Sequence, residues 1–102
     1  MPNVVRQGDR FVGSVHHGQS DCPHYVTGSF IQGAVKTNVN GSSAVRVDDV
    51  GLSTNPHNPR ATALSGGANF IEGKPVHRLG DKVDLGAGIG DSIQASPNVL
   101  SK

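Results

Sequence analysis

Alternating apolar and polar positions predict a short β-hairpin near the middle of the chain. Every second residue from Val35 to Val39 is Val or Thr, the residues between are polar, and Asn40-Gly41 follows directly. Such alternation is typical of a half-buried strand, and Asn-Gly best tolerates the two positive φ angles of a tight hairpin turn. Residues 35–39 and 43–47 are therefore expected to pair.

An Arg-x-x-Asp turn occurs three times along the chain. The copies begin at Arg6, Arg46 and Arg78 and end at the aspartates 9, 49 and 81. Ahead of the last copy, residues 69–71 and 75–79 predict a second hairpin, which is looser because a proline at 75 cannot donate to the ladder. The repeated turn indicates a repeated structural unit.

The two chain ends supply the halves of a third hairpin. Residues 4–6 form an outgoing strand with no incoming partner, and residues 96–100 form an incoming strand with nothing after it. Pairing of the ends would close a ring of three hairpins about a pseudo-threefold axis and remove open strand edges. The intervening segments 10–27, 50–65 and 82–95 are rich in Gly, Ser, Asn and Pro and are expected to be long irregular loops.

Composition narrows the fold class to all-β. The 102 residues suffice for one small domain, spanning 1–102, and Val outnumbers Leu 13 to 5 beside 14 Gly and 6 Pro. With three Phe, one Tyr and no Trp, large core side chains are scarce, so a staple besides packing is expected. The single cysteine excludes an internal disulfide, which leaves a metal ion or a partner chain.

Charge and hydropathy exclude several partners. The net charge is +1 and the basic residues are scattered, so neither a nucleic acid nor a charged membrane surface is expected as a partner. No basic segment followed by a long apolar run opens the chain, and no 18-residue apolar stretch occurs in it. Neither a signal peptide nor a transmembrane helix is expected.

Histidines and the cysteine gather in two of the expected loops. Cys22 and His24 are two residues apart, His16-His17 precede them, and His57 lies in the second loop. One thiolate and three imidazoles suit a tetrahedral metal site. Neighbouring residues of an extended chain point opposite ways, so one of His16 and His17 would bind, and His17 is favoured because Gly follows it. The alternative is a small buried cysteine among solvated histidines.

The remaining polar residues favour structural roles over catalysis. Asp9, Asp49 and Asp81 stand at corresponding repeat positions, where each is expected to cap backbone N–H groups and pair with its own arginine. His77 lies in a hairpin strand and is expected to be structural. Because there is neither a nucleophile elbow nor a phosphate-binding glycine loop, the chain is not expected to be an enzyme.

Two motifs give the chain a family resemblance. The segments Val45-Arg46-Val47-Asp48-Asp49 and Pro75-Val76-His77-Arg78-Leu79-Gly80-Asp81 look like the Pro-Ala-Ala-Arg-x-Gly-Asp signature, and Ser96-Pro97-Asn98-Val99 looks like a Gly-Ser-Pro-Asn-Val element. They resemble the PAAR-repeat proteins, which cap the spike of type VI secretion systems and contractile phage tails. The resemblance implies a small cone of three pseudo-threefold hairpins, its loops converging on zinc or iron held by His17, Cys22, His24 and His57.

The same resemblance implies a mechanical function. The domain would sharpen a trimeric β-helical spike, one monomeric tip per trimer, with Val39, Phe70 and Val99 at the docking base, and would touch the target membrane only mechanically. It would be assembled in the bacterial cytoplasm and then delivered outside at the spike tip. A phage tail and a secretion system remain open, as does a fused or bound effector. The alternative is a zinc-stabilised β adaptor that binds another protein or carries cargo.

Overall fold

The computed structural model describes residues 2–15, 24–55, 58–86 and 88–102, and of His24 only the backbone. Every regular element in these ranges is a strand, as the composition predicts. The ten strands are β1 (Arg10–Val15), β2 (His24–Phe30), β3 (Asn38–Val39), β4 (Ser42–Ser43), β5 (Val50–Ser53), β6 (Arg60–Ala63), β7 (Phe70–Ile71), β8 (Lys74–Pro75), β9 (Lys82–Asp84) and β10 (Ile89–Ser92). No helix in the described part of the chain is long and apolar enough to cross a membrane.

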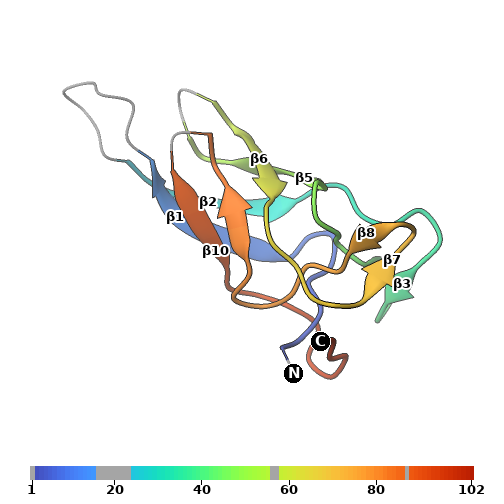
Figure 1. The fold of residues 1–102 in the computed structure, drawn as a ribbon. Helices are drawn as coiled ribbons and strands as arrows, with labels where there is room; N and C mark the ends of the chain where they lie inside the picture. The colour runs from blue at the N-terminus through green and yellow to red at the C-terminus, as the bar shows by residue number, and fades with distance from the viewer. Residues whose placement is uncertain (1, 16–23, 56–57, 87) are drawn as a thin grey trace.

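Six strands close into a barrel in the order β1-β10-β9-β6-β5-β2, with every neighbouring pair antiparallel (Figure 1). The barrel consists of three hairpins, β1–β2, β5–β6 and β9–β10. Hairpins β5–β6 and β9–β10 lie within segments 50–65 and 82–95, and β1–β2 begins in segment 10–27 and continues to Phe30, so the expectation of irregular loops was wrong for about half of these segments.

Glycine explains why these strands were missed. Phe11 faces Gly28 across the β1–β2 pair and is fully buried. A Cβ on Gly28 would lie 2.3 Å from the Leu52 carbonyl oxygen and 2.6 Å from the Phe11 ring. Glycine therefore provides the space that lets an aromatic ring fill a narrow barrel. In the sequence the same glycines indicate turns, because no side chain marks their inward face.

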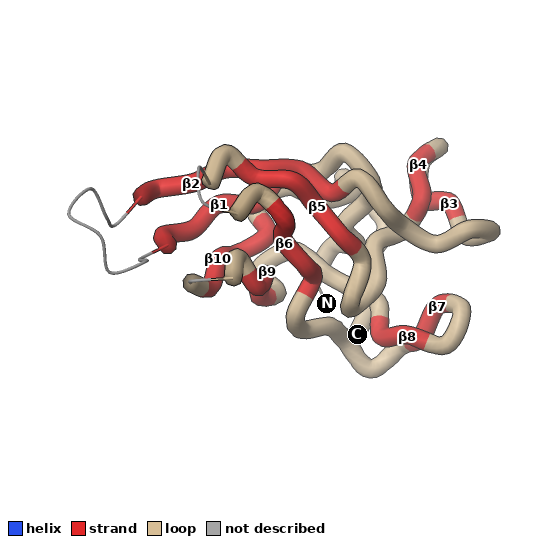
Figure 2. Tube along the Cα trace, turned by 90° about the horizontal axis from the view of Figure 1, so that it is seen from above, coloured by secondary structure: helices blue, strands red, loops and turns tan. Residues whose placement is uncertain are grey.

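The two predicted hairpins lie beyond one end of the barrel. Strands β3–β4 turn at Asn40-Gly41 with φ angles of 51° and 86°, and β7–β8 turn at Glu72-Gly73 with φ angles of 52° and 86°. The two turns are therefore confirmed, but each strand has two residues, where three strands of five residues and one of three, residues 69–71, were expected. Figure 2 shows both hairpins on the opposite side of the barrel from the end of β1 and the start of β2.

The chain ends pair, but over fewer residues than predicted, because Val5 and Arg6 bond to other segments. Asn3 bridges Leu100, and the Val4 N–H donates to the Val99 carbonyl at 2.8 Å. The Ser96 N–H donates back to the Val4 carbonyl, also at 2.8 Å. The paired chain ends thus form a third element beside the hairpins β3–β4 and β7–β8. We call this end of the molecule, comprising β3–β4, β7–β8 and the paired termini, the base.

A closed cycle of hydrogen bonds joins the three parts of the base. The Val45 N–H donates to Val5 O at 2.9 Å, the His77 N–H to Val45 O at 2.9 Å, and the Val5 N–H to His77 O at 3.0 Å. Each of these residues directly precedes the arginine of a repeated turn. The cycle separates the barrel core around Phe11 from a smaller cluster, in the base, around Ala44.

The molecule is elongated, with extents of 42 × 23 × 23 Å. Because antiparallel strands alternate in direction around the barrel, β1, β5 and β9 end, and β2, β6 and β10 begin, at the end of the barrel away from the base. The fold thus has two different ends, a base of short hairpins and an opposite end where β1, β5 and β9 finish.

Candidate functional site

The repeated arginine turns connect the barrel to the base in the same way three times. In each copy the Asp carboxylate accepts the Arg backbone N–H at 2.8 Å and two guanidinium N–H groups at 3.0–3.3 Å. The capping and pairing predicted for Asp9, Asp49 and Asp81 are therefore confirmed. Since all three carboxylates are occupied by a cation and a backbone donor, the structure favours the structural interpretation over acid–base chemistry.

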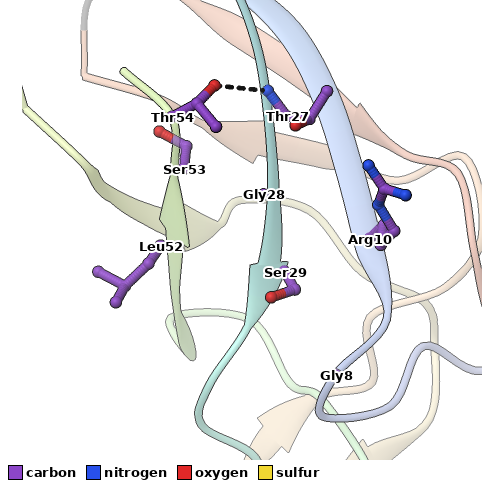
Figure 3. A pocket seen from close by; sticks show the side chains of 8 residues that line it. All are labelled: Gly8, Arg10, Thr27, Gly28, Ser29, Leu52, Ser53 and Thr54. Carbon is purple, nitrogen blue, oxygen red and sulfur yellow. Dashed lines mark hydrogen bonds between the residues drawn. The ribbon is translucent and has the colours of Figure 1, made fainter. Parts of the chain in front are cut away.

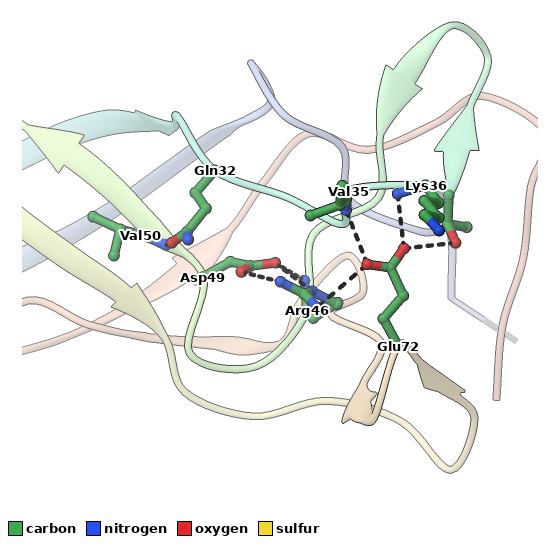
Figure 4. Close-up of polar contacts among 8 residues, drawn as sticks. Gln32, Val35, Lys36, Arg46, Asp49, Val50 and Glu72 are labelled. Carbon is green, nitrogen blue, oxygen red and sulfur yellow. Dashed lines mark hydrogen bonds and ion pairs between the residues drawn. The ribbon is translucent and has the colours of Figure 1, made fainter.

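Glu72 links hairpin β7–β8 to the segment before β3. Its carboxylate accepts the backbone N–H groups of Val35 at 3.0 Å and Lys36 at 2.9 Å, and it lies 3.8 Å from the Arg46 guanidinium (Figure 4). The Thr37 hydroxyl is a further donor at 3.1 Å. The hydrogen bond from the Lys36 amide is the largest reason that the pKa of Glu72 lies below its ordinary value. Hairpin β7–β8 is thereby fixed to the segment before β3.

The three predicted docking residues differ in exposure. Val39 is buried in the base cluster and Val99 is half-buried, whereas Phe70 is 65% exposed. The hydrogen bonds show which residues of the three repeats correspond. Backbone amides at equivalent positions donate to the carbonyls of Thr37, Asn69 and Val99. The residues that follow these three in sequence are all exposed, namely Asn38, Phe70 and Leu100. Asn38, Phe70 and Leu100 therefore occupy corresponding exposed positions around the base. The spacing along the chain predicted Val39 and Val99 instead, each one residue away.

A second set of corresponding residues surrounds the molecule between barrel and base. Ile31, Leu64 and Ile93 each follow the second strand of a barrel hairpin. Each donates its backbone N–H, at 2.9–3.0 Å, to the carbonyl of the first residue of the next hairpin around the barrel. They are 49%, 47% and 51% exposed. Three aliphatic side chains with nearly equal exposure at corresponding positions offer three similar apolar contacts, which suits a partner with three similar subunits.

Of the four predicted metal ligands, the structure describes only the backbone of His24. His17, Cys22 and His57 fall outside the described residues, so their arrangement stays a prediction. His24 begins β2, and its backbone pairs with Val15 where the β1–β2 hairpin continues into the connecting segment. Among the residues that the structure describes, no group of three or more His, Cys, Asp and Glu side chains could hold a metal ion.

The barrel wall carries an open depression of about 410 Å³ over β1, β2 and β5 (Figure 3). Gly28 forms its floor, and Arg10 is the only charged residue that lines it. At one edge the Thr27 N–H donates to the Thr54 hydroxyl at 3.2 Å. The lining residues include no general base and no pair of titratable groups, so the depression offers no catalytic arrangement.

Comparison with known proteins gives one partial similarity. No family model matches the chain. Over 66 residues, or 64% of its length, the chain is 38% identical to double-stranded DNA deaminase toxin A of Burkholderia cenocepacia strain H111. The matched segment spans 5% of that toxin's length, so the similarity concerns a small part of a much larger protein.

Proposed function

We propose that this chain is a PAAR-like tip domain that caps and sharpens the trimeric β-helical spike of a contractile injection machine. The hydrogen-bond cycle of Val5, Val45 and His77 is the observation that carries the proposal. One asymmetric chain can match a trimer only if it presents three similar surfaces, and this cycle supports a pseudo-threefold arrangement of the three hairpins. The two equal short extents of 23 Å support a cone-like shape about the same axis.

The base is the proposed docking face. Asn38, Phe70 and Leu100 are exposed at corresponding positions there, and Ile31, Leu64 and Ile93 flank them. Each triplet would meet three identical subunits of the spike, one tip to one trimer. The expectation for Val39, Phe70 and Val99 is thereby refined, with Phe70 retained as an exposed contact and the other two placed in the supporting layer.

The opposite end is the proposed apex, closed by zinc or iron. The barrel topology supports convergence, because β1 and β5 end and β2 and β6 begin at one end of the barrel, and His17, Cys22 and His57 stand between these strands in the sequence. One thiolate with three imidazoles is a donor set that zinc accepts in closed structural sites. A closed site would crosslink two hairpins where the domain meets resistance, which suits a mechanical role in piercing a target envelope. The bound ion would add stability without chemistry.

The similarity to a deaminase toxin does not extend to a proposed activity. Zinc deaminases hold their metal with one His and two Cys, or with three Cys, and use a nearby Glu as proton carrier. This chain has one cysteine, and its single glutamate, Glu72, is occupied by backbone amides and Arg46. A segment covering 5% of a long toxin fits better with a module that helps carry the rest to its target. We therefore propose a structural protein, assembled in the bacterial cytoplasm and released at the tip of a phage tail or secretion spike.

The test is docking to a trimeric β-helical spike fragment, measured by light scattering coupled to gel filtration. The expected complex contains one tip chain and three spike chains. The double variant Phe70→Asp/Leu100→Asp should abolish docking, since two unpaired charges would be buried in the interface. The matched control is Ile89→Asp, which adds a charge at an exposed apolar position of the barrel and should leave docking intact.

The second candidate function is a metal-stabilised adaptor that binds another protein or carries cargo. The partial match to a much longer protein is the observation that favours it. A complex with one partner subunit, or docking that Ile89→Asp disrupts while the double variant does not, would replace the spike tip by this adaptor. Metal content is a separate measurement, because both candidate functions include a bound ion. Purified protein should carry about one ion per chain, and Cys22→Ala should lose it.

A further inference from the structure

His77 occupies a position where the other two repeats have valine. The hydrogen-bond cycle places its backbone in correspondence with Val5 and Val45, and all three residues are fully buried. An imidazole thus replaces an aliphatic side chain at the centre of the molecule, where barrel and base meet. It is the only titratable imidazole in the core of the described residues.

The ring links three parts of the structure. Its Nδ1 lies 2.7 Å from the Ser65 carbonyl after β6, and its Nε2 lies 2.6 Å from the Ser92 hydroxyl of β10. Phe30 of β2 packs against it edge-on, with the ring centres 5.2 Å apart. A carbonyl oxygen only accepts, so Nδ1 carries the hydrogen and the uncharged ring accepts at Nε2 from the Ser92 hydroxyl. The neutral tautomer satisfies both nitrogens.

A charged ring would have no counter-ion of its own. The carboxylates of Asp81 and Asp49 favour the charged form, but each is already paired with an arginine, and Arg78 opposes it. Burial has the largest effect and lowers the pKa of His77, while the hydrogen bond to Ser65 acts in the opposite direction. On protonation, the Ser92 hydroxyl would also have to turn its hydrogen away from Nε2.

We propose that His77 is an acid-sensitive lock between the barrel and the base, holding the three hairpins together when neutral and loosening them when acid protonates it. This goes beyond spike capping and does not depend on it. Because the pKa is lower in the folded state than in the unfolded chain, the unfolded chain binds more protons in acid. The stability is therefore fully present above about pH 6.5 and is lost as pH falls from there through the folded pKa.

The matched variant is His77→Val, which restores the residue of the other two repeats. Urea unfolding of both proteins is followed from about pH 7.5 to about pH 5. The folding equilibrium of the natural chain should weaken about tenfold more than that of the variant for each unit by which the pH falls between about 6.5 and the folded pKa of His77. The other four histidines are common to both proteins, so the difference between the two pH profiles reports His77 alone. Equal profiles would overturn the proposal.

A measurement on the natural chain keeps the test independent of whether the variant folds. The titration of the His77 ring carbon resonance by NMR should have its midpoint below that of a free imidazole. Hydrogen exchange at that acidic pH should show lost protection at the Val5 and Val45 amides, which belong to the cycle, before the β1–β2 amides open. A midpoint at or above the free value, or loss of protection in the barrel first, would refute the lock.

Discussion

The aspartate of each arginine turn can be replaced by alanine, and the three aspartates differ in how deeply they are buried. Asp9, Asp49 and Asp81 make the same three hydrogen bonds, yet their side chains are 5%, 1% and 12% exposed. The partner of Asp49 is also the least exposed of the three arginines. Replacing each aspartate by alanine therefore varies the surroundings while the lost contacts stay constant.

The expected losses follow from burial. Removing one partner of a buried ion pair costs about 3–5 kcal/mol because the remaining charge stays buried, whereas a solvent-exposed pair contributes about 0–1 kcal/mol. Asp49→Ala should therefore lower the free energy of unfolding by about 3–5 kcal/mol, a large share of the roughly 5–15 kcal/mol of a small domain. Asp81→Ala should cost about 1–3 kcal/mol, chiefly through the lost hydrogen bonds to charged groups, and Asp9→Ala should fall between.

Urea unfolding followed by far-ultraviolet circular dichroism measures these losses, because the chain has no Trp and one Tyr. Asp49→Asn is the control: its amide oxygen still accepts the Arg46 N–H but carries no charge, so it should recover part of the loss. Equal losses at the three positions, or the largest loss at Asp81, would refute the reasoning from burial.

Three further predictions concern single features of the base and the turns. Glu72→Ala should speed hydrogen exchange at the Val35 and Lys36 amides at neutral pH, and Glu72→Gln should speed it less. In the natural chain, the protection of these amides should be lost as pH falls through the lowered pKa of Glu72. Unchanged exchange in the alanine variant would contradict the link that Glu72 makes. Asp48 has a φ of 79° where the other copies have glycine, so Asp48→Gly should raise the free energy of unfolding by up to about 1 kcal/mol, and a lower urea midpoint would count against this strain. Deleting residues 97–102 should expose an unpaired edge and cause aggregation seen by light scattering; a stable monomer would show that terminal pairing is dispensable.

Local turn chemistry made part of this fold predictable from the sequence. Asn40-Gly41 and the repeated Arg-x-x-Asp segments specify their conformations within four residues, since positive φ and side-chain capping act over that distance. The pairing of the chain ends, which the structure shows at Asn3 and Val4, followed from a repeat whose halves stand at the two ends. His77 was rightly expected to be structural. The metal site of His17, Cys22, His24 and His57 stays a prediction, because its side chains lie outside the described residues.

The barrel and the core lock were decided by the tertiary structure. Gly28 indicates a turn in the sequence and becomes an inward strand position only when the Phe11 ring lies across from it. Val39 and Val99 are each one residue away from the exposed positions of the base, because exposure there depends on which carbonyl each corresponding amide meets. His77 likewise acquires its chemistry only when Ser65, Ser92 and a phenyl ring surround it. Turns are determined by near neighbours along the chain, whereas burial and its effect on charge depend on residues that only folding brings together.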